Sequence, residues 1–189
     1  MIDQPPIDIR RAIQRVVDGY ELSSDEAATV MDTIMSGGAT PAQIGALATA
    51  LRMRGETVAE IAGFARTMRS HALPVSLPAD PRPIVDTCGT GGDGSGTFNI
   101  STTAAFVIAG AGTRVAKHGN RAATSQCGSA DLLEGLGVKI DMSPSEVAAS
   151  IQRTGFGFMF APAFHPVSGT PGRRAARSAF GRSSMPSDR

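Results

Sequence analysis

The sequence predicts an α/β protein in which a bundle of short helices precedes a parallel β-sheet. In the first third, apolar residues recur at helical spacing behind four helix-start signals. From Ile84 to Phe160, short apolar strands alternate with helices. That alternation favours a parallel sheet, because right-handed crossovers return each strand in the same direction. Eleven of the 22 glycines lie between Asp86 and Gly137, which places the candidate chemistry in the α/β part.

Four helices are predicted in the first third, and each has a recognisable boundary. The first ends before Gly19, and the second opens with the capping box 23–26. The third opens with Thr40-Pro41, and the fourth with the capping box 57–60. The apolar residues expected to pack in the helical core are Ile7, Ile9, Ile13, Val16, Val17, Ala27, Val30, Met31, Ile34, Met35, Ile44, Leu47, Ala50, Leu51, Met53, Ile61, Phe64 and Met68.

A proline-rich linker separates these helices from the α/β part. Ligands of parallel sheets bind beyond the carboxyl ends of the strands, and two loops rich in polar residues, 89–96 and 117–121, follow strands at that end. We predict strands at 84–85, 114–116, 138–140 and 157–160, and helices at 99–112, 129–136 and 144–151.

Composition excludes several classes of protein. With 189 residues, 41% hydrophobic and 19% charged, the chain is globular rather than disordered. A net charge of +1 gives no support for nucleic-acid binding or for a polybasic membrane surface. Cys88 and Cys127 lack metal-site spacing and are interpreted as packing residues. No apolar run reaches the roughly 18 residues that span a bilayer, and the amino terminus is too polar for a signal peptide, so a cytoplasmic location is expected.

The glycine-rich loop is the first candidate ligand site. Gly89–Gly94 matches G-x-G-x-x-G, but no acidic residue follows between Asp93 and Asp131 to hold a ribose, and no lysine follows Gly94 as in a P-loop. The loop leads instead to residues 99–102 at a helix start, where free amides and hydroxyls attract phosphate. Asp93 is placed to orient a loop amide or to approach a hydrated Mg²⁺. The alternative is a flexible turn with no ligand.

The second candidate is the run from Lys117 to Arg121, which supplies a cation, an imidazole, an amide and a guanidinium in five residues. Residues 124–129 then lead into another helix start, so two neighbouring anion sites would suit a ligand with separated phosphates. We expect His118 to line the pocket rather than to act as a general base. The alternative is a solvated loop.

Three stretches resemble the anthranilate phosphoribosyltransferase family: DTCGTGGDGSGTFNISTTAAFVIAGAG, VAKHGNRAATSQCGSADLLEGLGV and GFGFMFAPAFHP. The resemblance covers residues 7–166. Within this range the sequence differs from the family pattern at Thr124, where a serine is usual. It implies a helical bundle domain (1–72), a linker (73–83) and an α/β domain (84–167) of the nucleoside phosphorylase/phosphoribosyltransferase type. Nucleoside phosphorylases share this fold and are an alternative identity.

The resemblance implies transfer of phosphoribose from phosphoribosyl diphosphate to anthranilate, with release of diphosphate, in tryptophan biosynthesis. It implies Mg²⁺ on Ser101, a homodimer formed through the helical domain, and catalysis by positioning without a covalent nucleophile. Gly89 and Asn120 would also face anthranilate. The implied substrate-binding residues are Gly89, Gly92, Asp93, Thr97, Asn99, Ile100, Ser101, Thr102, Lys117, His118, Gly119, Asn120, Arg121, Ala122, Ala123, Thr124, Ser125 and Ser129.

The tail, residues 168–189, departs from the family and is predicted to be disordered; it holds five arginines and one aspartate. Read one nucleotide earlier from Gly169, GC-rich codons for this tail also encode RTIFNALGP, close to the expected segment. We therefore hypothesise a frameshift near residue 168. The remaining strands and an acidic Asp-Glu pair for Mg²⁺ would lie beyond residue 189, which leaves the sheet incomplete with apolar faces uncovered. We expect little turnover; the alternative function is a non-catalytic phosphate-ligand binding or interaction fragment.

Overall fold

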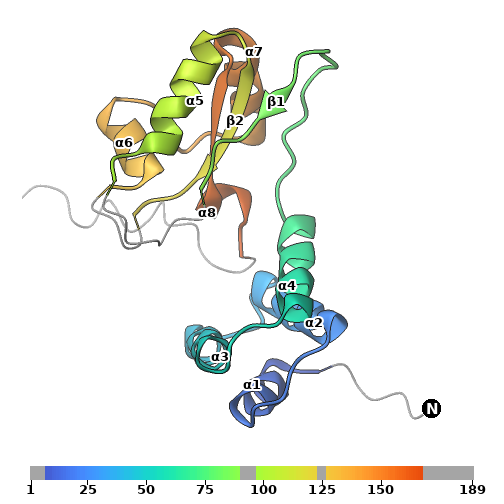
Figure 1. Cartoon of the computed structure of the whole chain (residues 1–189). Coiled ribbons are helices and arrows are strands. Elements are labelled where there is room, and N and C mark those ends of the chain that lie inside the picture. Colours follow the sequence, from blue (N-terminus) through green and yellow to red (C-terminus); the bar gives the residue numbers. More distant parts are fainter. Residues whose placement is uncertain (1–6, 90–96, 123–126, 168–189) are drawn as a thin grey trace, which may run out of the picture. The chain divides into compact units, whose positions relative to one another are not determined.

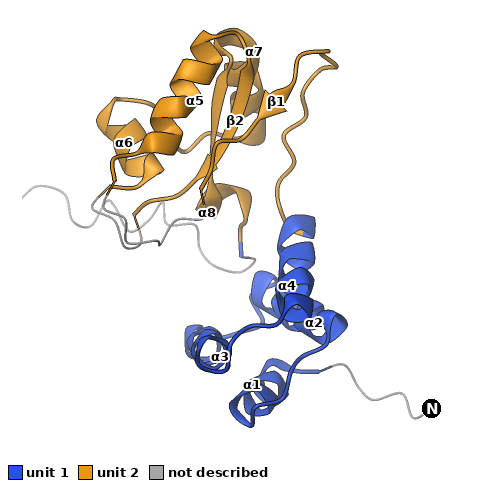
Figure 2. Ribbon diagram, viewed as in Figure 1, with its two compact units in different colours: residues 1–70, 167–189 blue, residues 71–166 orange. Residues whose placement is uncertain are grey.

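The computed structural model describes residues 7–89, 97–122 and 127–167 (Figure 1). Figure 2 shows the chain divided into two compact units, residues 1–70 with 167–189 and residues 71–166. Each is described by itself below. The predicted tail and most of the loop 89–96 lie outside the described residues.

The first unit contains the four predicted helices, and their predicted caps are confirmed. Ser23 and Thr40 each accept the amide of the residue three positions on, and the side chain of that residue, Glu26 or Gln43, accepts the cap's own amide. The fourth helix has the same reciprocal pair between Thr57 and Glu60. These bonds satisfy amides that a helix start leaves without partners. The helices are α1 (Ile9–Val17), α2 (Ser24–Met35), α3 (Pro41–Arg54) and α4 (Val58–Ser70).

The core of this unit differs from the prediction at α4. The prediction had Ile61 and Met68 facing inward, but they are 55% and 40% exposed, and the buried residues are Glu60, Gly63 and Thr67. A Cβ at Gly63 would lie 2.2 Å from the Ser24 carbonyl oxygen, so α4 packs backbone to backbone on α2 through its small residues. That close contact turns the larger apolar side chains outward. Val17 and Met53 were also predicted in the core and are exposed.

The second unit is built on a parallel sheet in the order β1-β2-β3, formed by β1 (Ile84–Val85), β2 (Arg114–Gly119) and β3 (Phe156–Phe160). Ile84 pairs with Arg114, and the β2–β3 register runs from Val115–Phe156 to Gly119–Phe160. The helices are α5 (Ile100–Gly110), α6 (Ser129–Gly135), α7 (Pro144–Thr154) and α8 (Ala161–Phe164).

Helices cover both faces of this sheet (Figure 1). Ala105 of α5 and Leu133 of α6 pack with Val115 and Phe158 on one face. Ile151 of α7 packs with Ala116 and Met159 on the other. Alternate residues of a strand face opposite sides, so Lys117 lies on the α5 side, with Val115.

Two predictions in this unit are wrong: a strand at 138–140 and a loop at 117–119. Residues 138–140 are not a strand; Ile140 is buried on the α5 side, and Lys139 pairs with Glu146 at 2.7 Å. A run of three residues, two of them apolar, is too short to distinguish a strand from a buried connection. Residues 117–119 were predicted as loop but continue β2, because β3 offers a pairing partner as far as Gly119.

The helix α5 is less buried than predicted. Phe98 and Val107 are 71% and 68% exposed, and they line an apolar hollow of about 300 Å³. Within the described residues, no helix is both long and apolar enough to cross a membrane.

Candidate functional site

The candidate site lies at the carboxyl ends of β1 and β2, beside the amino terminus of α5. Asp86, Thr87 and Cys88 follow β1 directly, and Lys117 to Gly119 form the end of β2. Asn99 is the N-cap of α5. The parallel register therefore brings both sequence-predicted segments to one edge of the sheet, the usual ligand edge of such folds.

Lys117 is the most informative residue at this edge. Its side chain is buried, and Nζ lies 3.1 Å from Ser101 Oγ and 3.4 Å from Thr87 Oγ1. Thr87 Oγ1 in turn donates to the Ser101 carbonyl at 2.8 Å. Burial lowers the pKa of Lys117, while nearby Asp86 acts in the opposite direction. No ion-pair partner of Lys117 is found in the described parts of the chain: its ammonium is hydrogen-bonded to the Ser101 and Thr87 hydroxyls, and Asp86 acts on it only from a greater distance. A bound anion would therefore give Lys117 a direct charged partner.

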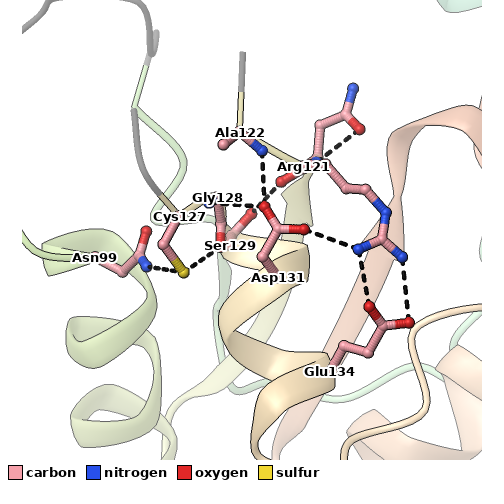
Figure 3. Close-up of polar contacts among 9 residues, drawn as sticks. Asn99, Arg121, Ala122, Cys127, Gly128, Ser129, Asp131 and Glu134 are labelled. Carbon is pink, nitrogen blue, oxygen red and sulfur yellow. Dashed lines mark hydrogen bonds and ion pairs between the residues drawn. The ribbon is translucent and has the colours of Figure 1, made fainter. Parts of the chain in front are cut away.

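The amino terminus of α5 lies next to this lysine. Asn99 caps the helix without a side-chain hydrogen bond, and its Nδ2 points instead to Cys127 Sγ at 3.5 Å (Figure 3). The Thr102 hydroxyl is completely buried and has no hydrogen-bond partner among the described residues. The helix therefore presents its positive end to the edge that also holds the Lys117 ammonium.

The imidazole of His118 is held in its uncharged form. Its backbone amide donates to Asp86 Oδ1 at 3.4 Å, and its ring packs edge-on against His165 with centroids 5.4 Å apart. Burial lowers the pKa of His118 below 6.5, and His165 lowers it further, so the ring is uncharged at pH 7. A neutral imidazole fits the predicted lining role.

Cys88, like His118, donates its backbone amide to the Asp86 carboxylate. Its amide donates to Asp86 Oδ1 at 2.9 Å. A separate hydrogen bond between the Cys88 side chain and Asp86 raises the pKa of the thiol, and partial desolvation and the Asp86 charge act in the same direction. A protonated thiol is a poor nucleophile.

The end of β2 packs tightly against the start of α6. The Asn120 carbonyl accepts from Ser129 Oγ at 3.3 Å and from the Ala130 amide at 3.2 Å. A Cβ on Gly119 would lie 2.2 Å from Ser129 Oγ. A side chain here would have to displace Ser129 Oγ and the Phe158 ring, so glycine permits this close packing.

The predicted site residues have different environments. Thr97, Asn99, Ile100, Ser101 and Thr102 surround the start of α5, and Lys117 to Ala122 with Ser129 lie at the β2–α6 junction. Among the described residues other than its chain neighbour, no heavy atom lies within 4 Å of a Cβ placed on Gly89. The Arg121 guanidinium pairs with two carboxylates of α6 rather than standing free. The remaining predictions, Gly92, Asp93, Ala123, Thr124 and Ser125, lie outside the described residues.

Some residues of this edge were missed from the sequence. Thr87 and Asp86 could have been found, since they directly follow a predicted strand at its ligand end. Asp131 could have been identified as a cap, because it stands three residues after Gly128. Asp131 occupies the amino terminus of α6, the second predicted anion site, with its own carboxylate.

The described residues do not by themselves fit a magnesium ion. Within them, no three acidic, histidine or cysteine side chains converge as a metal site. Ser101 Oγ, the predicted ligand, is 3.1 Å from a lysine nitrogen, and Mg²⁺ prefers carboxylate, phosphate and water oxygens.

Comparison with known proteins gives consistent matches. Residues 81–175 match the glycosyl transferase family, a/b domain, and residues 10–72 match the helical bundle domain of the same family. The chain is 61% identical over 159 residues to an anthranilate phosphoribosyltransferase of Roseiflexus sp. (strain RS-1), covering 84% of this chain and 46% of the relative. A Chloroflexus aurantiacus enzyme of the same name is 62% identical over 161 residues, covering 85% of this chain and 47% of that enzyme.

Solved structures agree. The Thermus thermophilus anthranilate phosphoribosyltransferase matches with a TM-score of 0.71 and 48% identity, over 82% of this chain and 47% of that one. The Saccharomyces cerevisiae enzyme in complex with PRPP and Mg matches with a TM-score of 0.70 and 31% identity, over 83% and 47%. The chain thus spans about half the length of the relatives it matches.

Proposed function

The chain belongs to the glycosyl transferase family, and from this premise we propose that its α/β unit binds phosphoribosyl diphosphate at the edge formed by Thr87, Ser101 and Lys117. The reaction served is transfer of the phosphoribosyl group to the anthranilate amine, giving N-(5-phosphoribosyl)anthranilate and diphosphate in tryptophan biosynthesis. The similarity to anthranilate phosphoribosyltransferases supports this substrate pair.

The buried ammonium of Lys117 is the observation that carries the proposal. In the transfer, the C1–O bond to diphosphate breaks, the diphosphate keeps the electron pair, a C1–N bond forms, and the amine loses a proton to solvent. Negative charge therefore grows on the leaving diphosphate. A desolvated cation beside the positive end of α5 stabilises that charge more strongly than a solvated one would.

Magnesium belongs to this proposal as a companion of the substrate. Since the described residues form no cage for it, we propose that the ion would be bound together with the diphosphate, to which it would supply positive charge, and Ser101 is the residue of the chain that the resemblance assigns to it. Titration of phosphoribosyl diphosphate with and without Mg²⁺ tests this, and equal affinity in both would contradict it.

Isothermal titration with phosphoribosyl diphosphate and Mg²⁺ tests the binding function. We expect saturable binding with one ligand per chain. Absence of heat at millimolar ligand would contradict the proposal. Saturable binding of a nucleoside in place of phosphoribosyl diphosphate would favour the related nucleoside phosphorylase.

A polypeptide of these 189 residues is expected to form almost no product. Positioning contributes roughly 7–11 kcal/mol to such reactions only when both substrates and the metal are held, and the chain spans 46% of its Roseiflexus relative. The loss of anthranilate fluorescence in the presence of phosphoribosyl diphosphate and Mg²⁺ measures turnover. Rapid consumption by the purified chain would contradict this expectation. Binding without turnover would match the alternative of a phosphate-ligand binding fragment.

We also propose that the helical unit associates as a homodimer in the cytoplasm. Met53 of α3 and Val58 and Ile61 of α4 are 84%, 85% and 55% exposed, and burial of exposed apolar side chains favours association. Sedimentation equilibrium is expected to show a dimer at micromolar concentration. A monomer across the accessible concentration range would contradict it.

A further inference from the structure

The Asp131 carboxylate joins the end of β2 to the start of α6 (Figure 3). Its Oδ2 accepts the backbone amides of both Ala122 and Gly128, each at 2.9 Å. Its Oδ1 accepts from Arg121 Nη1 at 2.8 Å. One side chain therefore fixes the residues that stand on either side of segment 123–126. These three hydrogen bonds hold the pKa of Asp131 below its ordinary value, so the carboxylate is ionised at neutral pH.

Arg121 reinforces this junction. Nη1 and Nη2 bond to Glu134 of α6 at 2.8 and 3.2 Å, and the guanidinium lies 5.8 Å from the centre of the Phe160 ring. Its donors are directed at Asp131 and Glu134, as Figure 3 shows. Arg121 thus binds the strand end to α6 instead of presenting a free positive charge to a ligand.

The backbone segments of this junction approach each other closely at Gly128. A Cβ on Gly128 would lie 2.3 Å from the Ala122 nitrogen and 2.8 Å from the Asn120 carbonyl oxygen. Asn120 and Ser129, which are candidate substrate-binding residues, are joined by a hydrogen bond in this contact. A shift of Ala122 against Gly128 would therefore displace both Asn120, which directly follows β2, and Ser129, which begins α6.

We propose that Asp131 is a positioning residue for the phosphoribosyl diphosphate site: by holding the Ala122 and Gly128 amides it sets the placement of Asn120 and Ser129. This inference rests on the proposed function. A carboxylate would repel a polyanionic ligand, so Asp131 acts through the backbone and not by contact with the ligand.

The Asp131→Asn variant tests this role at constant side-chain size. An amide cannot reproduce a carboxylate that accepts three donors, and hydrogen bonds to charged groups are strong enough that we expect phosphoribosyl diphosphate affinity to fall at least about tenfold. Hydrogen exchange in the free chain is expected to be faster at the Ala122 and Gly128 amides. Should this variant fail to fold, Asp131→Glu displaces the carboxylate by one methylene and is expected to weaken binding in the same direction.

Glu146→Gln is the matched control. Glu146 is also a capping carboxylate with a cationic partner, accepting from the Ser143 amide at 2.8 Å and from Lys139 at 2.7 Å, but it caps α7. The Glu146→Gln variant is expected to be less stable than the parent but to bind phosphoribosyl diphosphate with the same affinity. Equal affinities of Asp131→Asn and the parent would overturn the positioning role while leaving the proposed function intact. Absence of binding by the parent would overturn both, and unchanged exchange at Ala122 and Gly128 would overturn the backbone clamp by itself.

Discussion

Replacement of Lys117 by methionine is expected to remove phosphoribosyl diphosphate binding while leaving the free chain at least as stable as the parent. The two effects have opposite signs because the ammonium is buried beside two hydroxyl groups without a carboxylate partner among the described residues. Its desolvation destabilises the free chain, whereas a bound diphosphate would compensate its charge. Methionine fills a similar volume without the charge.

The expected loss of affinity is at least about 100-fold, the equivalent of about 2.7 kcal/mol, which is within the range for a charge-assisted hydrogen bond. Calorimetric titration measures it, and denaturant unfolding measures the stability. The chain has one other lysine, so Lys139→Met is the natural control: Lys139 is 57% exposed and paired with Glu146. Unchanged affinity in Lys117→Met, or an equal loss in Lys139→Met, would contradict the assigned role.

Replacement of Glu60 by alanine is expected to cost the helical unit about 3–5 kcal/mol, the range for breaking a buried ion pair by removal of one partner. Glu60 is completely buried and accepts the Leu22 amide at 2.9 Å and the Thr57 amide at 2.9 Å. It also pairs with Arg54. Removal leaves two amides and a largely buried guanidinium without their acceptor. Thermal or denaturant unfolding measures the loss.

Glu56→Ala serves as the control, because Glu56 is exposed on the same connection; a change within about 0.5 kcal/mol is expected there. The pH dependence provides a second test. Burial raises the pKa of Glu60, but hydrogen bonds from Arg54 and from backbone amides outweigh it, so the pKa lies below 4.5. The stabilisation is therefore complete above pH 4.5 and is lost as pH falls through the lower, folded-state value. A parent and a Glu60→Ala variant of equal stability at pH 7 would contradict this account.

Local features of this fold could be predicted from sequence. The capping boxes at Ser23, Thr40 and Ser143 and the glycine stop after α1 each depend on residues within a few positions. That the two candidate segments meet at one edge of the sheet was also predictable, because the carboxyl ends of parallel strands lie on the same side. The family resemblance, carried by its three motifs, agrees with the family and the relatives that the chain matches.

Non-local features could not be predicted. The inward face of α4 is decided by a close approach at Gly63 and by a carboxylate that bonds to Leu22, 38 residues earlier. The strand β2 extends to Gly119 because β3 pairs with it there. The roles of Arg121 and Asp131 depend on distances across a junction that the spacing of residues does not contain. The individual substrate contacts remain predictions.

An amide chemical-shift map of the ¹⁵N-labelled chain, titrated with phosphoribosyl diphosphate and Mg²⁺, tests the central claim most directly. We predict saturable shifts at Thr87, Ser101 and Lys117, with residues of α1 to α4 unaffected. Absence of saturable shifts, or shifts confined to the helical unit, would contradict the proposal that the carboxyl edge of β1 and β2 holds the diphosphate.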